Sequence, residues 1–219
     1  SAREALVLAV ELSSAMHQDD VAPTRLLRLR SKLADLLRAR ADGETALVVY
    51  AGDAYTVVPL TQDSANLALY VDALAPTVMP EDGQRPDLAI ARAVSLLQGK
   101  GIERGTIVLL AGAADAAAAR AAAQARAQGW TVSVLAVRNA VDGPLQAVAS
   151  AGGGRATAIS LDGKDLQELG VLGSARQAAA QAADAHGVAG KVRRDDGFWL
   201  LPLVLLLLLI LAMHQLMFR

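Results

Sequence analysis

Residues 5–12 read ALVLAVEL, an apolar run rich in valine and leucine that follows charged residues. Such a run predicts a strand buried on both faces of a parallel sheet. Residues 24–40 come next, with leucine at positions 26, 29, 33, 36 and 37, which is the period of an α-helix. This segment begins after Pro23 and ends before Asp42 and Gly43, which are helix start and stop signals. A buried strand followed by a helix predicts the opening unit of an α/β fold.

The same alternation continues along the chain. Two short strands at 45–50 and 55–60 are separated by Ala51-Gly52-Asp53-Ala54, a sequence that favours a hairpin. After them we expect helices at 63–74, 87–97, 114–128, 143–151 and 165–186, and strands at 106–110, 131–137 and 156–161. Strands that alternate with helices predict a doubly wound, mostly parallel sheet with helices on both faces.

Residues 198–218 read FWLLPLVLLLLLILAMHQLMF, a nearly uncharged stretch of about the length that an α-helix needs to cross a bilayer. Trp199 and Pro202 suit one end of such a span, because indole rings favour the headgroup region and proline is tolerated in a first helical turn. We therefore expect a soluble α/β domain at 1–186, a hydrated linker at 187–197 and a transmembrane helix at 198–218.

Composition and motifs exclude several classes of function. The chain has no cysteine, which rules out thiol catalysis, disulfide frameworks and cysteine-based zinc sites. The glycines at 152–154 lead into a late strand and do not join a first strand to a helix, so they do not form a phosphate-binding loop. No serine nucleophile elbow and no triad context for a histidine is present. We therefore do not expect an enzyme, and a membrane-bound hydrolase is the most distant alternative.

The predicted helix at 24–40 is strongly basic. It is either a solvated face or a surface for an acidic partner or anionic headgroups. Because it lacks interleaved aromatic side chains, it does not predict nucleic-acid binding. Its cations are Arg25, Arg28, Arg30, Lys32, Arg38 and Arg40.

In a doubly wound sheet, ligands bind in the loops after the carboxyl ends of the strands. We therefore expect the site in the loops after Leu12, Leu110 and Val137, together with the proline-rich stretch 76–86. The first of these loops carries Glu11 and Ser13, a carboxylate and a hydroxyl at the end of a buried strand. This pairing is typical of the start of a hard-cation site, which is built from oxygen ligands. His17 has no second histidine near it and is a poor metal ligand.

At this loop the chain resembles the von Willebrand factor A domains, whose first-strand motif is Asp-x-Ser-x-Ser. Glu11, Ser13 and Ala15 occupy the three places. Over nearly its whole length the chain also resembles the membrane-anchored bacterial A-domain proteins of the aerotolerance (Bat) type. The matching segments, in order, are DVAPTR at 20–25, YAGDAY at 50–55, PLTQD at 59–63, MP at 79–80, AIARA at 89–93 and GFWLL at 197–201. The Bat-type patterns for the first two are Asp-Val-x-Pro-Ser-Arg and Phe-x-Gly-x-Ala-Tyr.

The resemblance implies a degenerate metal site. The family's threonine ligand in the loop before the third helix aligns with Gln84, and its aspartate after the fourth strand aligns with Ala111. A divalent ion needs about six oxygen ligands, so Glu11 and Ser13 alone would leave mostly water, and we expect neither tight metal binding nor another cofactor. The alternative is a magnesium- or manganese-dependent adhesion domain. In that alternative Glu11, Ser13 and a substitute ligand, Asp115, hold the ion, unless Asp115 caps the following helix instead.

We therefore expect a non-enzymatic, membrane-anchored module that assembles with other proteins through its loop surface. The residues expected at that surface are Glu11, Ser13, Ser14, Met16, His17, Gln84, Arg85 and Asp87. The resemblance implies three partners: another A-domain membrane protein, tetratricopeptide-repeat proteins and a MoxR-type AAA+ ATPase. The predicted span 198–218 adds contact with membrane lipid.

The expected location is the bacterial inner membrane. Lys191, Arg193 and Arg194 precede the predicted span, whereas Arg219 follows it, and a count of these cations alone would place the domain in the cytoplasm. The resemblance implies the opposite, a periplasmic domain. We follow the resemblance, because upstream helices would dominate the orientation.

Overall fold

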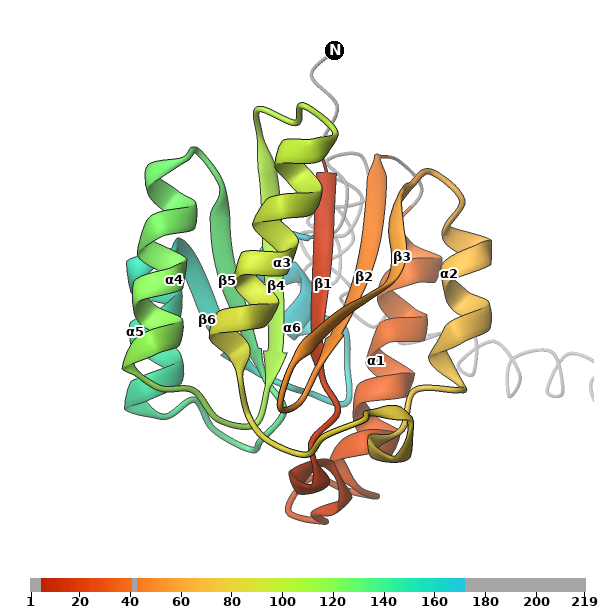
Figure 1. The fold of residues 1–219 in the computed structure, drawn as a ribbon. Helices are drawn as coiled ribbons and strands as arrows, with labels where there is room; N and C mark the ends of the chain where they lie inside the picture. The colour runs from red at the N-terminus through yellow and green to blue at the C-terminus, as the bar shows by residue number, and fades with distance from the viewer. Residues whose placement is uncertain (1–4, 41–42, 172–219) are drawn as a thin grey trace, which may run out of the picture. The chain divides into compact units, whose positions relative to one another are not determined.

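The computed structural model describes residues 5–40 and 43–171, which include a six-stranded sheet in the order β3-β2-β1-β4-β5-β6 (Figure 1). The strands are β1 (Ala5–Glu11), β2 (Glu44–Tyr50), β3 (Ala54–Thr61), β4 (Gly105–Ala111), β5 (Thr131–Ala136) and β6 (Gly153–Ala158). Neighbouring strands pair in parallel except for β2 and β3, which form an antiparallel hairpin. The predicted doubly wound, mostly parallel sheet is confirmed.

Helices cover both faces of this sheet (Figure 1). They are α1 (Arg25–Ala39), α2 (Ser64–Val71), α3 (Pro86–Gly99), α4 (Ala116–Ala127), α5 (Gly143–Ala151) and α6 (Lys164–Leu169), with short 3-10 turns η1 (Ser14–His17) and η2 (Pro76–Val78). Helices α3, α4 and α5 form one core with the sheet, and α1, α2 and α6 form the other. Along β1, Val7 and Ala9 enter the first core, while Leu8 and Val10 enter the second. This two-sided burial explains why the strand is almost continuously apolar.

The last strand begins earlier than the sequence predicts. It starts at Gly153, whereas we expected a strand from residue 156. A Cβ atom at Gly152 would lie 2.5 Å from the Cβ of Val132, so glycine is needed for the chain to approach β5 closely. The glycine cluster therefore serves strand packing.

The final predicted helix is shorter than expected. Helix α6 ends at Leu169, and Gly170 then adopts a left-handed conformation with φ 68°, a typical helix stop. The expected helix at 165–186 is therefore confirmed at its start but interrupted at Gly170, and residues 172–186 lie outside the described residues. The predicted linker at 187–197 and span at 198–218 also lie outside them. Across residues 5–40 and 43–171, no helix is both long and apolar enough to cross a membrane.

The basic residues of α1 bind within the chain. Arg25 pairs with Asp20 at 2.6 Å, and Lys32 pairs with Asp165 at 2.8 Å, with both cations buried. The other bonds run from Arg28 to the Ala22 carbonyl, from Arg30 to the Leu74 carbonyl, from Arg38 to the Asp35 carboxylate and from Arg40 to the Val171 carbonyl. Because all of these cations except Arg38 bind other segments of the domain, we do not propose α1 as a surface for lipid or an acidic partner.

Candidate functional site

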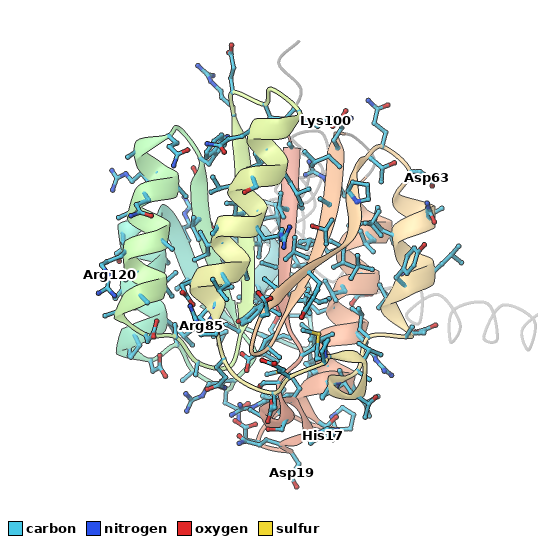
Figure 2. All side chains as sticks on the ribbon, in the orientation of Figure 1. His17, Asp19, Asp63, Arg85, Lys100 and Arg120 are labelled. Carbon is cyan, nitrogen blue, oxygen red and sulfur yellow. The ribbon has the colours of Figure 1, made fainter. Side chains whose placement is uncertain are left out.

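The predicted site loops gather at the carboxyl edge of the parallel strands. Figure 2 shows His17, Asp19 and Arg85 toward this end of the molecule, with Lys100 and Asp63 at the opposite end. The loop after β1 touches the segment before α3, because the backbone N–H of Ser14 donates to Asp82 Oδ1 at 2.8 Å. The β2–β3 turn joins the same segment through a 3.2 Å bond from Gly52 N–H to the Glu81 carbonyl.

The centre of this edge is the carboxylate of Glu11, the last residue of β1, whose exposed fraction is 0%. Three donors from separate segments converge on it. Ser13 Oγ and Gln84 Nε2 donate to Oε1 at 2.5 and 2.9 Å, and the Gly112 backbone N–H donates to Oε2 at 2.6 Å. A buried carboxylate is tolerated only with such partners, so Glu11 links the loops after β1 and β4 to the segment before α3.

Tyr50 lies beside Glu11, because the two residues are register partners at the ends of β2 and β1. Its side chain is fully buried. Burial, and next the negative charge of Glu11, raise the pKa of Tyr50 well above its usual value. The phenol of Tyr50 therefore stays neutral beside the carboxylate.

A buried arginine borders the other side of the cluster. A Cβ atom at Gly112 would lie 2.9 Å from Arg25 Nη1 and 3.6 Å from Glu11 Oε2, which places the guanidinium near Glu11. Arg25, however, already makes a two-pronged contact with Asp20, at 2.6 and 2.8 Å. The hydrogen bond from Arg25 lowers the pKa of Asp20, so this carboxylate keeps its charge. Arg25 is therefore paired with Asp20, whereas neutral donors hold Glu11.

The structure separates the predicted surface residues into two groups. Glu11, Ser13 and Met16 are buried, so they lie beneath the surface and support it. Met16 in particular is a correction to the expected contact surface, because η1 turns its side chain into the core beside α1. The exposed members are Ser14, His17, Gln84 and Arg85, whereas Asp87 is half-buried.

Two of these residues form an ion pair at the start of α3. Arg85 contacts the Asp87 carboxylate through Nε at 2.9 Å and Nη2 at 2.7 Å. Hydrogen bonding to Arg85 lowers the pKa of Asp87, and the same contact raises that of Arg85. Next to this pair, hydrogen bonds from Ser14 lower the pKa of Asp82, so the carboxylate that holds the two loops together remains ionised at neutral pH.

These residues do not fit a divalent metal ion. Both oxygens of Glu11 are engaged by donors, and Gln84 turns its amide N–H toward the carboxylate. Ala111 is buried at the end of β4 and offers no side-chain oxygen. Asp115 caps α4 by accepting from the Ala118 N–H at 2.9 Å, which is the structural role weighed for it above. In the described part of the chain, no three His, Cys, Asp or Glu side chains are grouped to hold an ion.

The described loops do not bring a serine and a histidine together in the arrangement that a hydrolase uses. The imidazole Nδ1 of His17 lies 3.2 Å from the backbone carbonyl of Ser14, and Ser13 Oγ donates to Glu11. A serine nucleophile needs a base that accepts its proton and is itself oriented by a third group. Here Ser13 donates its hydroxyl proton to the buried Glu11 carboxylate in a hydrogen bond.

Several members of the cluster are not evident from sequence reasoning. Tyr50 and Gly112 reach Glu11 only because parallel pairing brings the ends of β1, β2 and β4 together. Asp82 lies in the proline-rich stretch singled out above, but its bond to Ser14 depends on the loop conformation. The sequence carries no local signal for these contacts, because they depend on strand register and loop conformation.

The chain matches a known protein family and resembles several solved structures. Residues 6–116 match the family model of the von Willebrand factor type A domain. An aerotolerance-related membrane protein from Bacteroides fragilis NCTC 9343, solved with multiple mutations to serines, is 20% identical with a TM-score of 0.67 over 76% of this chain and 98% of that chain. The conserved hypothetical protein BatB from Bacteroides thetaiotaomicron is 21% identical with a TM-score of 0.65 over 83% and 97%.

A more distant likeness is the PilB minor pilin from Streptococcus sanguinis, 13% identical with a TM-score of 0.59 over 75% of this chain and 58% of that chain. A search of the curated proteins found no match. At these identities the solved structures establish the fold.

Proposed function

Because the chain belongs to the family of von Willebrand factor type A domains, we propose that it is a non-enzymatic protein-interaction module that binds its partner without a metal ion. The observation that carries this proposal is the Glu11 carboxylate, which Ser13, Gln84 and Gly112 already satisfy. A domain that needs an ion to complete its binding site would present free oxygens to that ion.

The contact surface is the exposed part of the carboxyl edge. Ser14, His17, Gln84 and Arg85 lie there, and the bond from Ser14 to Asp82 holds their two loops together. A surface fixed in this way loses little conformational entropy on binding. The partner would therefore meet a preformed surface and would not supply a metal ligand.

The module works at a membrane in this proposal. One of the two Bacteroides structures is of an aerotolerance-related membrane protein, and the other is of BatB. Residues 198–218 have the length and apolar character of a membrane span. We place the domain on the periplasmic side of a bacterial inner membrane. The proposed partners are another A-domain membrane protein, tetratricopeptide-repeat proteins and a MoxR-type AAA+ ATPase system.

The test is affinity capture of the full chain from native membranes in a non-ionic detergent, with magnesium or with EDTA. We expect a reproducible partner that survives EDTA and is lost from the double variant His17→Ala, Arg85→Ala. Arg120→Ala is the matched control, because Arg120 is exposed on α4, away from the loops (Figure 2). Release of the partner by EDTA, or equal loss in the control, would contradict the proposal.

A further inference from the structure

We propose that a cavity at the amino edge of the sheet binds a small phosphate-bearing anion through Arg40 and Arg104. The cavity has a volume of about 280 Å³ and lies where β1, β4 and β5 begin, at the opposite edge of the sheet from Glu11 (Figure 1). This volume is at the lower end of the range for ligand pockets, so it suits a small ligand. The site goes beyond the proposed function, because none of its residues belongs to the contact surface for the partner.

A buried arginine gives the wall of this cavity a fixed positive charge. Arg40 directly follows α1 and is 7% exposed. Its guanidinium donates through Nε to Thr45 Oγ1 at 3.0 Å and through Nη1 to the Val171 carbonyl at 3.3 Å. In the described part of the chain, no carboxylate lines the cavity together with this cation. An anion that enters therefore meets a positive group that is already held in place.

Arg104 supplies a second positive charge. It precedes β4, and its exposed side chain lines the same cavity. Its guanidinium makes no ion pair or hydrogen bond with any residue that the structure describes. A guanidinium group is a planar fork of donors that matches two oxygens of a phosphate group. The donors of Arg104 are therefore available to an oxyanion that Arg40 attracts.

Two threonine hydroxyls add neutral donors to the lining. Thr106 and Thr131 are register partners near the starts of β4 and β5, on strands about 5 Å apart. Both side chains face α1 and α6, since alternate residues of a strand share a face and Val108 and Leu135 pack in that core. Neither hydroxyl bonds to another group within residues 5–40 and 43–171. These donors favour phosphate over a carboxylate, because phosphate has more oxygens to accept from them.

Isothermal titration calorimetry with inorganic phosphate tests the site. The full chain is titrated in a non-ionic detergent at constant ionic strength, and we expect saturable binding with a Kd of about 1 mM or below. Arg104→Gln should raise this Kd at least about tenfold, because it removes a charge-assisted pair of bonds to the anion. Arg120→Gln removes an equally exposed arginine from α4 and should leave the Kd unchanged.

Soluble phosphate esters and lipid headgroups both carry this group, and two further probes separate them. Glycerol 3-phosphate represents the soluble ester. Short-chain phosphatidic acid, kept below its micelle concentration, represents the headgroup of a lipid. Tighter binding of glycerol 3-phosphate assigns a soluble ligand to the cavity, whereas tighter binding of phosphatidic acid assigns a lipid.

Three results would overturn the proposal. The first is the absence of saturable binding by all three probes. The second is a Kd for Arg104→Gln equal to that of the native chain, or an equal loss in Arg120→Gln. The third is binding that disappears in the double variant His17→Ala, Arg85→Ala, which would place the anion at the carboxyl edge. Arg40→Gln should also weaken binding, and if it lowers the melting temperature, Arg104→Gln still decides, because the Arg104 side chain holds no other described residue.

Discussion

The side-chain amide of Gln84 donates a 2.9 Å hydrogen bond to the carboxylate of Glu11, 73 residues earlier in the chain. This bond joins the segment before α3 to the end of β1. Together with the bonds from Ser13 and Gly112, it gives the carboxyl edge a fixed conformation without an ion. Each of the following predictions tests one part of that arrangement.

Ser13 and Gln84 donate to the same oxygen of Glu11 but differ in exposure. Ser13→Ala removes a buried donor that water cannot replace, and it should lower the free energy of unfolding by about 2 kcal/mol. Gln84→Ala exposes the carboxylate to water and should cost less than about 1 kcal/mol. Urea unfolding of both variants measures the difference. A larger loss of unfolding free energy for Gln84→Ala than for Ser13→Ala would contradict this prediction, because it would show that the exposed amide stabilises Glu11 more than the buried hydroxyl does.

Gly112 lies against the ends of two buried side chains. A Cβ atom there would lie 2.9 Å from Arg25 Nη1 and 3.2 Å from Met16 Cε, and both neighbours are buried. Gly112→Ala should therefore destabilise the domain by about 1–3 kcal/mol. At Gly99 no atom lies within 4 Å of such a Cβ, so Gly99→Ala in α3 should be neutral or slightly stabilising. Equal melting temperatures for the two variants would refute the close packing at Gly112.

Lys32 and Asp165 form a buried ion pair at 2.8 Å that fastens α1 to the start of α6. Lys32→Met leaves the Asp165 carboxylate buried without its cation and should lower stability by about 3 kcal/mol. The pair of Lys164 with Asp162 is exposed, and Lys164→Met should change stability by less than about 0.5 kcal/mol. Chemical denaturation compares the two, and a similar small effect for both would contradict a structural role for the buried pair.

The contact between Asp20 and Arg25 predicts a pH dependence. Hydrogen bonding from Arg25 lowers the pKa of Asp20 below its ordinary value of 3.8. A carboxyl group whose pKa is lowered in the folded state contributes stability above the unfolded value, and this contribution is lost as the pH falls through the folded value. Asp20→Asn should therefore destabilise the domain at pH 6, and the gap from the native chain should shrink below pH 3.8. A difference in stability that grows in acid would contradict a lowered pKa for Asp20 in the folded state.

The layered fold could be predicted from the sequence because the burial of each strand and helix determines the spacing of its apolar residues. Strand β1 is apolar on both faces since its residues enter two cores, and the leucine period of α1 follows from contact with one of them. The end of α6 is less evident from the sequence. Gly170 stops the helix, yet one glycine within a helical pattern is also compatible with a longer helix.

The site could be predicted only in part. Glu11, Ser13 and Gln84 follow from motif positions, and the structure brings these three together. Met16 was expected at the surface but is buried, because a polar-looking loop does not reveal which side chain a 3-10 turn directs inward. The proximity of Tyr50 depends on strand register, which is a property of the sheet.

The central claim is that this edge binds a partner without an ion, and calorimetric titration of the full chain with magnesium and manganese tests it most directly. The account predicts no heat of binding at micromolar to low millimolar metal, and the same result for Glu11→Ala. Micromolar binding by the native chain that disappears in Glu11→Ala would contradict it. That result would restore Glu11 and Ser13 as metal ligands.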